Sequence, residues 1–214
     1  MSRFNDTIRA ALADFLGRMY EKEIASHRRS TLARARGRVL EIGAGTGFNV
    51  AHYPDAVEEI VLTEPGRELL RRAERRASGS GRRVEFVHAA AENLPFDSGS
   101  FDTVVSTLVL CSVRDQDQAL SEIRRVLKPG GELLFMEHVR ADDPKLARWQ
   151  DRLERPWRVL AMGCHPNRAT LERIEAAGFY VQELRTGDLP KSPPIARPLV
   201  TGRASSPQTP VTRP

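Results

Sequence analysis

The stretch Glu41-Ile42-Gly43-Ala44-Gly45-Thr46-Gly47-Phe48 decides the fold of this 214-residue chain. It follows an apolar pair, Val39-Leu40, at a point where a strand turns sharply into a helix. Glycines at three alternate positions allow a tight turn and let the backbone approach a ligand that a Cβ would exclude. The acid at the strand end, Glu41, can accept hydrogen bonds or pair with a cation. The stretch therefore predicts a ligand-binding turn between a strand and a helix.

A dinucleotide fingerprint would place its third glycine where this chain has Phe48. The pattern Glu-x-Gly-x-Gly-x-Gly resembles instead the first motif of class I methyltransferases that use S-adenosyl-L-methionine (SAM). The resemblance implies that the backbone N–H groups of this loop face the methionine part of SAM. It also implies that S-adenosyl-L-homocysteine is the product.

The composition indicates one globular domain, since 40% of the residues are hydrophobic and 29% are charged. No apolar stretch approaches the roughly 20 residues of a transmembrane helix, and the N-terminus lacks a signal-peptide core. We therefore expect no transmembrane segment and a cytoplasmic location. The two cysteines, Cys111 and Cys164, make neither a disulfide framework nor a zinc motif, so we expect no metal.

The net charge of +5 raises the question of a nucleic-acid partner. The basic residues are mostly arginines on helical segments such as 67–76, where acids alternate with them. This pattern is typical of a solvated helix face. We expect a small-molecule methyl acceptor and no nucleic acid, with the protein a monomer or a homodimer.

Apolar β-branched runs alternate with helical patterns from Arg38 onward, which favours βαβ units. We predict an α/β fold, a Rossmann-like doubly wound seven-stranded sheet that is mostly parallel and has an antiparallel last strand. The expected strands are 38–42, 59–63, 83–87, 102–109, 131–138, 179–185 and 198–204. The expected helices after the first lie at 46–52, 66–78, 115–127, 144–161 and 168–177, the last with Asn167 as N-cap and ending at Gly178.

The N-terminal segment 4–26 carries apolar residues at helical spacing. It caps the core, forms a lid over the cofactor, or makes peripheral contact with a membrane. We favour the cap or lid, and we assign residues 1–30 to it within a methyltransferase domain of residues 1–204. Residues 205–214 are rich in Ser, Thr and Pro, and we expect a disordered tail.

Polar residues follow the strands at the edge where a doubly wound sheet binds its ligand. Glu64 lies 21 residues after Gly43, placed to accept both ribose hydroxyls. The resemblance to methyltransferases implies that Ala91-Glu92 contacts the adenine edge. The alternative for Glu92 is an acid near a helix N-terminus.

Further along, the expected fourth strand leads into Thr107-Leu108-Val109-Leu110-Cys111-Ser112-Val113. This run lacks the Asn/Asp-Pro-Pro-aromatic motif with which many nucleic-acid amino methyltransferases hold the amine. Cys111 fits a pocket-lining residue better than a nucleophile, because methyl transfer from SAM needs no covalent enzyme intermediate. His138 ends the expected fifth strand and is our candidate general base.

From Tyr20 to Ala204 the chain resembles the methyltransferase-like thiol S-methyltransferases and their bacterial relatives. The animal members methylate alkyl thiols and hydrogen sulfide. The resemblance rests on residues 45–49, Tyr53-Pro54, 107–113, 125–131, 135–139, Pro156-Trp157, Gly163-Cys164 and Arg168. It implies cofactor contacts at Tyr20, Glu41, Gly43, Gly45, Gly47, Asn49, Glu64, Ala91, Glu92 and Thr107. For the acceptor it favours a pocket of Cys111, Trp149, Trp157, Cys164 and His165, although both tryptophans are equally typical of a core.

Two departures from the family bear on the substrate. The apolar N-terminal membrane anchor of the animal enzymes is absent from this sequence, and the acid after the second strand, commonly Asp, is Glu64. S-methylation of a thiol is our leading hypothesis. The alternatives are C-, N- or O-methylation of a quinone precursor, a phospholipid amine or a natural product. A further alternative is a SAM-binding protein without catalysis.

Overall fold

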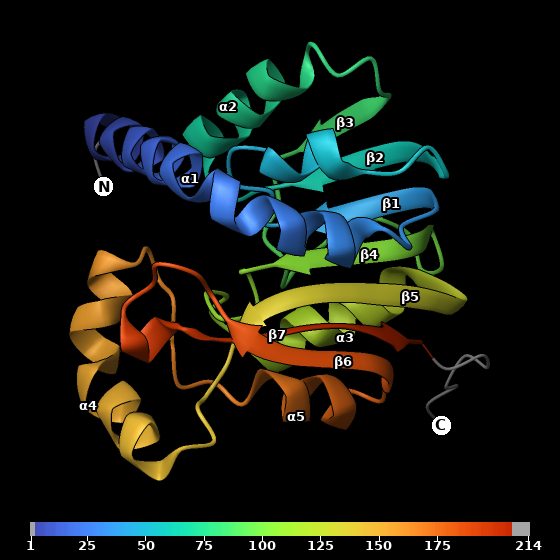
Figure 1. The fold of residues 1–214 in the computed structure, drawn as a ribbon. Coiled ribbons are helices and arrows are strands. Elements are labelled where there is room, and N and C mark those ends of the chain that lie inside the picture. Colours follow the sequence, from blue (N-terminus) through green and yellow to red (C-terminus); the bar gives the residue numbers. More distant parts are fainter. Residues whose placement is uncertain (1–2, 207–214) are drawn as a thin grey trace.

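A computed structural model describes residues 3–206, and its centre is a seven-stranded sheet of order β3-β2-β1-β4-β5-β7-β6 (Figure 1). β7 runs antiparallel to both of its neighbours, and the other strand pairs are parallel. The predicted fold class is therefore confirmed. The strands are β1 (Gly37–Ile42), β2 (Val57–Thr63), β3 (Val84–Val87), β4 (Phe101–Thr107), β5 (Leu127–His138), β6 (Tyr180–Asp188) and β7 (Pro198–Ser205).

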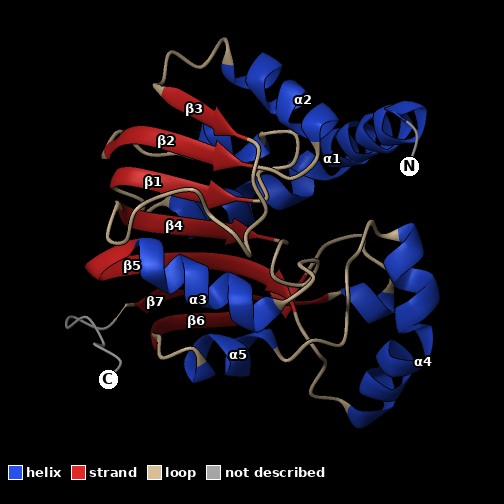
Figure 2. Ribbon diagram, turned by 180° about the vertical axis from the view of Figure 1, so that it is seen from behind, coloured by secondary structure: helices blue, strands red, loops and turns tan. Residues whose placement is uncertain are grey.

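Helices cover both faces of the sheet, as apolar faces on both sides require. Leu32 of α1 and Ala73 of α2 pack on one face, whereas Leu120 of α3 and Ile174 of α5 pack on the other (Figure 2). The helices are α1 (Arg3–Leu32), η1 (Phe48–His52), α2 (Arg67–Ala77), α3 (Gln116–Val126), α4 (Pro144–Leu160), α5 (Thr170–Ala176) and η2 (Pro194–Ala196).

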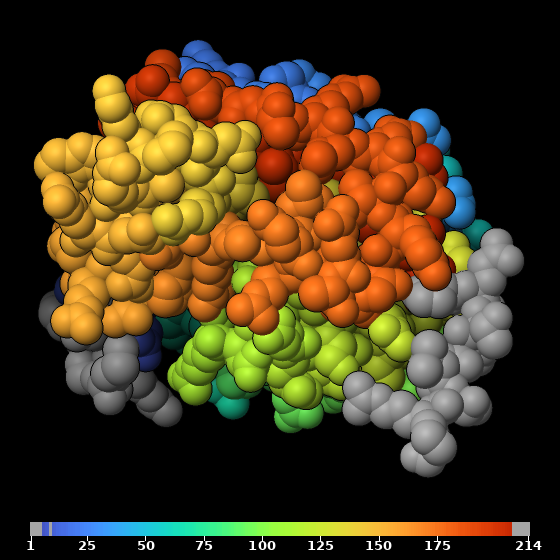
Figure 3. All heavy atoms as spheres, turned by 90° about the horizontal axis from the view of Figure 1, so that it is seen from below, coloured from blue at the N-terminus to red at the C-terminus, as the bar shows by residue number. Residues whose placement is uncertain are grey.

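α4 stands beyond the carboxyl ends of the strands, on the same side as the first half of α1 (Figure 1). Seen from below, α4 forms a block at one end of the molecule beside α5 and β6 (Figure 3). Its last residues Val159 and Leu160 are exposed. The two helices therefore flank the sheet edge at which a doubly wound fold binds its ligand.

Several element boundaries differ from expectation. α5 begins at Thr170 with Ala169 as N-cap, so the predicted N-cap is wrong, because the Asn167 amide donates instead to Asp151. β4 ends at Thr107, two residues early, because Leu108 takes a left-handed φ of 60°. β7 continues through Ser205, so the predicted tail starts too early. The rest of that tail, 207–214, lies outside the described residues.

α1 is longer than expected, and its second half buries Ile24, Thr31 and Leu32 against the rest of the protein. It crosses the first βα unit closely, since a Cβ on Gly17 would overlap the ring of Phe48. The Arg76 guanidinium lies 3.7 Å from the centre of that ring and also pairs with Asp14 of α1. α1 is thus a cap over the turn that follows β1.

Towards its N-terminus, α1 exposes an apolar stripe of Ile8, Leu12, Phe15 and Met19. No helix within residues 3–206 combines the length and apolar character that crossing a membrane requires. Peripheral membrane contact by this stripe stays a prediction.

Candidate active site

The three glycines after β1 serve different purposes. A Cβ on Gly43 would lie 2.6 Å from a methyl of Val109, and one on Gly47 would lie 3.0 Å from Cα of Ala73. These two glycines therefore allow close packing within the protein. Gly45 also has a left-handed backbone, with φ of 57°, but a Cβ there would meet nothing within 4 Å. The open space beside Gly45 is where a ligand can approach the backbone.

Glu64 follows β2 and is joined directly to this loop. Its carboxylate accepts from the backbone N–H of Gly45 at 3.0 Å and of Gly66 at 2.8 Å. Burial raises the pKa of Glu64, against the two N–H groups that favour its carboxylate. The structure thus brings Glu64 to the glycine loop as the spacing predicted, and its contact with ribose hydroxyls stays a prediction.

Beneath the loop lies a buried polar network centred on Glu41. Its carboxylate accepts from Asn49 Nδ2 at 3.0 Å and from the Tyr53 hydroxyl at 2.7 Å. The Asn49 amide also donates to Thr107 Oγ1 and accepts from Arg28 of α1. Burial raises the pKa of Glu41 to about 7, although Tyr53 and Arg28 favour the ionised form.

Glu41, Asn49 and Tyr53 form one hydrogen-bonded network, whereas the sequence showed them only as separate residues. Asn49 is buried and uses both ends of its amide within the protein, so its first role is to fix the turn. Direct contacts of Glu41, Asn49 and Thr107 with SAM stay predictions.

Glu92 lies near a helix N-terminus, as the alternative interpretation of this residue predicted. Its Oε1 accepts from the backbone N–H of Arg114 at 2.7 Å and of Asp115 at 3.4 Å, just before α3. It is therefore an acid near a helix N-terminus, and its adenine contact stays a prediction. Ala91 beside it is buried in the core.

At the ends of β4 and β5, the organising residue is Glu137, which sequence reasoning missed. Its buried carboxylate accepts from Ser106 Oγ at 2.6 Å and from the backbone N–H of Val109 at 3.0 Å and Cys111 at 3.2 Å. Burial raises the pKa of Glu137, and these donors oppose the rise. An acid between the apolar Phe135-Met136 and the strand end was the available signal.

The segment after α4 is fastened to the same loop from the other side. Arg168 donates to the carbonyl oxygens of Leu110 and Val113, each at 2.7 Å. The backbone N–H of His165 donates to the Cys111 carbonyl at 2.8 Å. Both ends of the Cys111 peptide unit are therefore fixed by distant parts of the chain.

These constraints bring three buried side chains together: Cys111, His138 and Cys164. His138 Nδ1 lies 3.3 Å from the Cys164 sulfur and 4.0 Å from the Cys111 sulfur. Both cysteines are free thiols. His138 Nε2 is buried and has no hydrogen-bond partner among the described residues.

The three groups shift one another's protonation. The pKa of Cys164 is lowered, chiefly because Cys111 donates its S–H to that sulfur, and the same contact raises the pKa of Cys111 well above its ordinary value. Burial favours the neutral ring of His138, yet the sulfur of Cys111 and the charge of Glu137 raise the pKa of His138 overall.

Of the two tryptophans predicted to line the pocket, Trp157 lies near the cluster and Trp149 lies at the surface. The Trp157 indole lies near enough to Cys164 to help lower the pKa of that thiol, although its buried Nε1 makes no hydrogen bond of ordinary geometry with any described residue. Trp149 is 53% exposed under Arg152, so a core role for it is wrong. The His165 ring nitrogen Nδ1 lies 2.8 Å from Glu154 Oε1. Tyr20 packs with Ile24, Met136 and Leu108.

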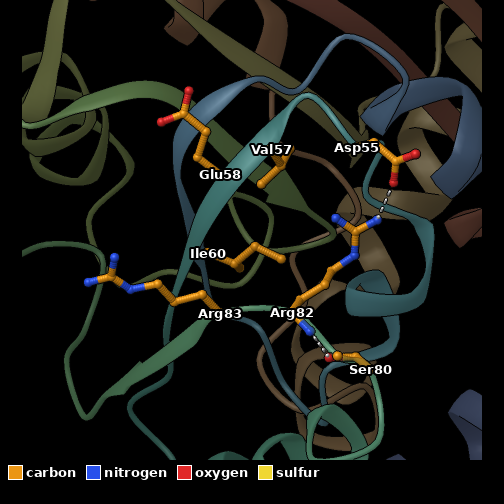
Figure 4. A pocket seen from close by; sticks show the side chains of 8 residues that line it. Asp55, Val57, Glu58, Ile60, Ser80, Arg82 and Arg83 are labelled. Atoms are coloured by element: carbon orange, nitrogen blue, oxygen red, sulfur yellow. Dashed lines mark hydrogen bonds and ion pairs between the residues drawn. The ribbon is translucent and has the colours of Figure 1, made fainter.

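A prominent hollow of about 370 Å³ lies elsewhere and does not belong to this site. Its lining includes Val57 at the start of β2 and Arg82 and Arg83 before β3, with Arg82 paired to Asp55 (Figure 4). That is the amino end of the strands, opposite the edge that carries the glycine loop.

Comparisons with known proteins agree with the geometry. Residues 40–135 match the methyltransferase domain family. Human thiol S-methyltransferase TMT1A is 35% identical over 199 residues, which cover 87% of this chain and 81% of that protein. Rat TMT1B is 37% identical over 68% of this chain and 61% of its own length. The quinone C-methyltransferase UbiE of Hahella chejuensis is 38% identical over 55% of this chain and 49% of its own.

Solved structures show the same fold. A methyltransferase-like protein from Bacillus halodurans superposes with a TM-score of 0.70 at 18% identity, over 85% of this chain and 98% of that one. The [4+2]-cyclase SpnF superposes with a TM-score of 0.68 at 22% identity, over 87% of this chain and 80% of the cyclase chain.

Fold, glycine loop and relatives together define a class I SAM-dependent methyltransferase, an enzyme of class EC 2.1.1 whose cofactor is SAM. Within this class, the chain belongs to the family that includes human TMT1A.

Proposed function

We propose that this enzyme transfers the methyl group of SAM to the sulfur of a small thiol. The observation that carries the proposal is the buried Cys111–His138–Cys164 cluster at the same sheet edge as the glycine loop. The relatives TMT1A and TMT1B are thiol S-methyltransferases, which supports the proposal because this chain aligns with most of TMT1A.

The two halves of the site adjoin through one close contact. Gly43 of the cofactor loop packs against Val109, two residues before Cys111. An acceptor near Cys111 and His138 thus lies beside the loop that holds the methionine end of SAM. The sulfonium makes the methyl group electrophilic, so the enzyme must mainly align the acceptor and exclude water, and alignment alone can supply about 7–11 kcal/mol.

A thiol acceptor also needs to lose its proton. Ordinary thiols have a pKa near 8.5 and are only partly ionised at neutral pH. His138 is the titratable group that we place at the acceptor, as a base or as a group that holds the thiolate. The surrounding buried sulfur atoms suit a soft, weakly solvated acceptor better than a charged amine.

The experiment is an acceptor screen with labelled SAM. The panel contains an alkyl thiol, hydrosulfide, an aryl thiol, a demethylated quinone precursor and phosphatidylethanolamine. We expect methylation of the thiols, and Gly45→Val should abolish it. Turnover of the quinone precursor or the amine alone would overturn the thiol assignment. Absence of SAM turnover with every acceptor would favour a SAM-binding protein without methyl transfer.

A further inference from the structure

The Cys111–His138–Cys164 cluster has the composition and spacing of a metal site. The residues come from three separate segments, the turn after β4, the end of β5 and the turn after α4 (Figure 1). Their ligand atoms all lie within 4.8 Å of one another, and all three residues are buried. The count of two cysteines led us to expect no zinc site, but the fold adds a histidine between them.

We propose that Cys111, His138 and Cys164 bind one Zn²⁺ ion and leave its fourth position to the acceptor thiolate. Binding of the ion stands on the cluster alone, whereas the role of the fourth position rests on the proposed thiol methylation. Two cysteines, one histidine and an open position are a known ligand set of catalytic zinc.

The distances fit the ion. With Zn–S of about 2.3 Å and Zn–N of about 2.0 Å, a tetrahedral site separates nitrogen from sulfur by about 3.5 Å. The observed separations from His138 Nδ1 are 3.3 Å and 4.0 Å, on either side of that value. Both nitrogen–sulfur separations therefore lie within about half an ångström of the tetrahedral value.

The supporting contacts hold the ligands in place. Glu137 fixes the Cys111 N–H, the His165 N–H fixes the Cys111 carbonyl, and Arg168 holds the loop on both sides. His138 Nε2, by contrast, has within residues 3–206 no second partner of the kind that fixes most zinc-bound histidines. This ligand set points to an exchangeable catalytic ion and not to one required for folding.

The proposed step balances as follows. With zinc bound, His138 holds the thiolate through the metal and does not act as the base: the acceptor R–SH binds zinc as R–S⁻ and releases its proton to solvent. A lone pair of that sulfur forms the new bond to the methyl carbon, and the bond from that carbon to the SAM sulfur breaks. Its electron pair stays on the sulfur of S-adenosylhomocysteine, which becomes neutral. The product R–S–CH₃ is a neutral thioether and a weaker ligand, so it leaves.

The first test measures metal binding without any turnover. Protein purified under reducing conditions and stripped with a chelator is titrated with Zn²⁺ against a chromophoric competitor, and bound metal is counted by mass spectrometry. We expect one zinc ion per chain. Cys111→Ser and Cys164→Ser should each weaken binding at least about 100-fold. His27→Gln, which changes a histidine of α1 outside the cluster, should leave it unchanged.

Circular dichroism of each variant keeps this test interpretable. Two outcomes would overturn the proposal: equal zinc affinity in the folded cysteine variants, or no zinc bound by the reduced wild-type protein.

The second test concerns the fourth position. The Co²⁺-loaded enzyme should show the intense visible bands of a tetrahedral site with thiolate ligands, and an added alkyl thiol should shift them. The same thiol should produce no shift with Cys164→Ser. Unchanged bands in an enzyme that methylates this thiol would overturn the activating role. A band shift in an enzyme without thiol methylation would instead contradict the proposed function alone.

Discussion

The cofactor edge after β1 and the acceptor edge after β4 and β5 differ in the sequence distance between their residues. At the cofactor edge, Glu41 reaches Asn49 and Tyr53, which lie 8 and 12 positions away. At the acceptor edge, Cys111, His138 and Cys164 are separated by 27 and 26 positions. The first is centred on a local turn, to which Arg28 and Thr107 add contacts from further away, and the second exists only once the sheet has formed.

The two edges also differ in chemistry. The cofactor edge is a network of charged and amide groups that fixes a backbone loop, whereas the acceptor edge gathers sulfur and imidazole around a buried carboxylate. The difference suggests that cofactor binding and acceptor recognition can be altered separately.

The largest effect is expected for Gly45→Val, which fills the open space at the cofactor edge. SAM affinity should fall more than about 1,000-fold, equivalent to about 4 kcal/mol. Gly99→Val is the matched control, because Gly99 also has a left-handed backbone and open space beside it. Both variants carry the same backbone strain of about 1–2 kcal/mol. Calorimetry on the two folded variants distinguishes them, and equal SAM affinity would refute the site.

The next effect concerns the stability supplied by the Glu41 network. Because burial raises the pKa of Glu41 to about 7, the folded state favours its protonated form. That contribution is complete below the unfolded pKa of 4.5 and is lost as the pH rises through about 7. Glu41→Gln mimics the protonated form at every pH. Its unfolding free energy relative to wild type should therefore rise by up to about 3 kcal/mol between pH 4.5 and 8.

Urea unfolding at several pH values measures this difference, since the other titrating groups cancel between the two proteins. Glu58→Gln, an exposed change on the neighbouring strand β2, should show no such trend. A pH-independent difference for Glu41→Gln would mean that the Glu41 carboxyl stays ionised in the folded protein.

At the acceptor edge, Arg168→Lys keeps the charge and removes the planar fork that binds two carbonyls. We expect kcat/KM for the acceptor to fall about 10- to 100-fold, because the loop that carries Cys111 loses its alignment. SAM affinity should stay within about twofold, as the cofactor edge has its own support. Arg173→Lys, at an exposed pair with Asp117, is the control. Equal losses for SAM and acceptor would show that the edges are coupled.

The same difference in sequence distance explains which parts of the fold could be predicted from the sequence. The glycine motif and the alternation of apolar runs suffice for the fold class, since both are local patterns. The predicted start of α5 was wrong because the Asn167 amide donates to Asp151, 16 positions away, instead of capping the helix. The early end of β4 has no sequence signal, because Leu108 adopts a left-handed φ that normally indicates glycine.

Within the site, sequence spacing placed Glu64 at the glycine loop, and the structure joins it there to Gly45. Glu137 was missed because its function depends on donors from a neighbouring strand and loop. The sequence analysis assigned Cys111, His138 and Cys164 to the acceptor site, but it missed that they form one set of metal ligands, since no short spacing motif connects them. Contacts between distant segments require the tertiary fold.

The smallest effect is expected for the two tryptophans, which the sequence could not tell apart. Trp157 lies near Cys164, whereas Trp149 is exposed under Arg152. Trp157→Phe removes the indole N–H and part of the ring, and we expect the acceptor KM to rise about 3- to 10-fold, near 1 kcal/mol. Trp149→Phe is the matched change on the same helix and should leave both KM values unaltered. Steady-state kinetics with each substrate varied in turn provides the comparison. A Trp157→Phe enzyme with equal rises for SAM and acceptor and a lower Tm would make Trp157 a packing residue, and the acceptor edge would then end at Cys164.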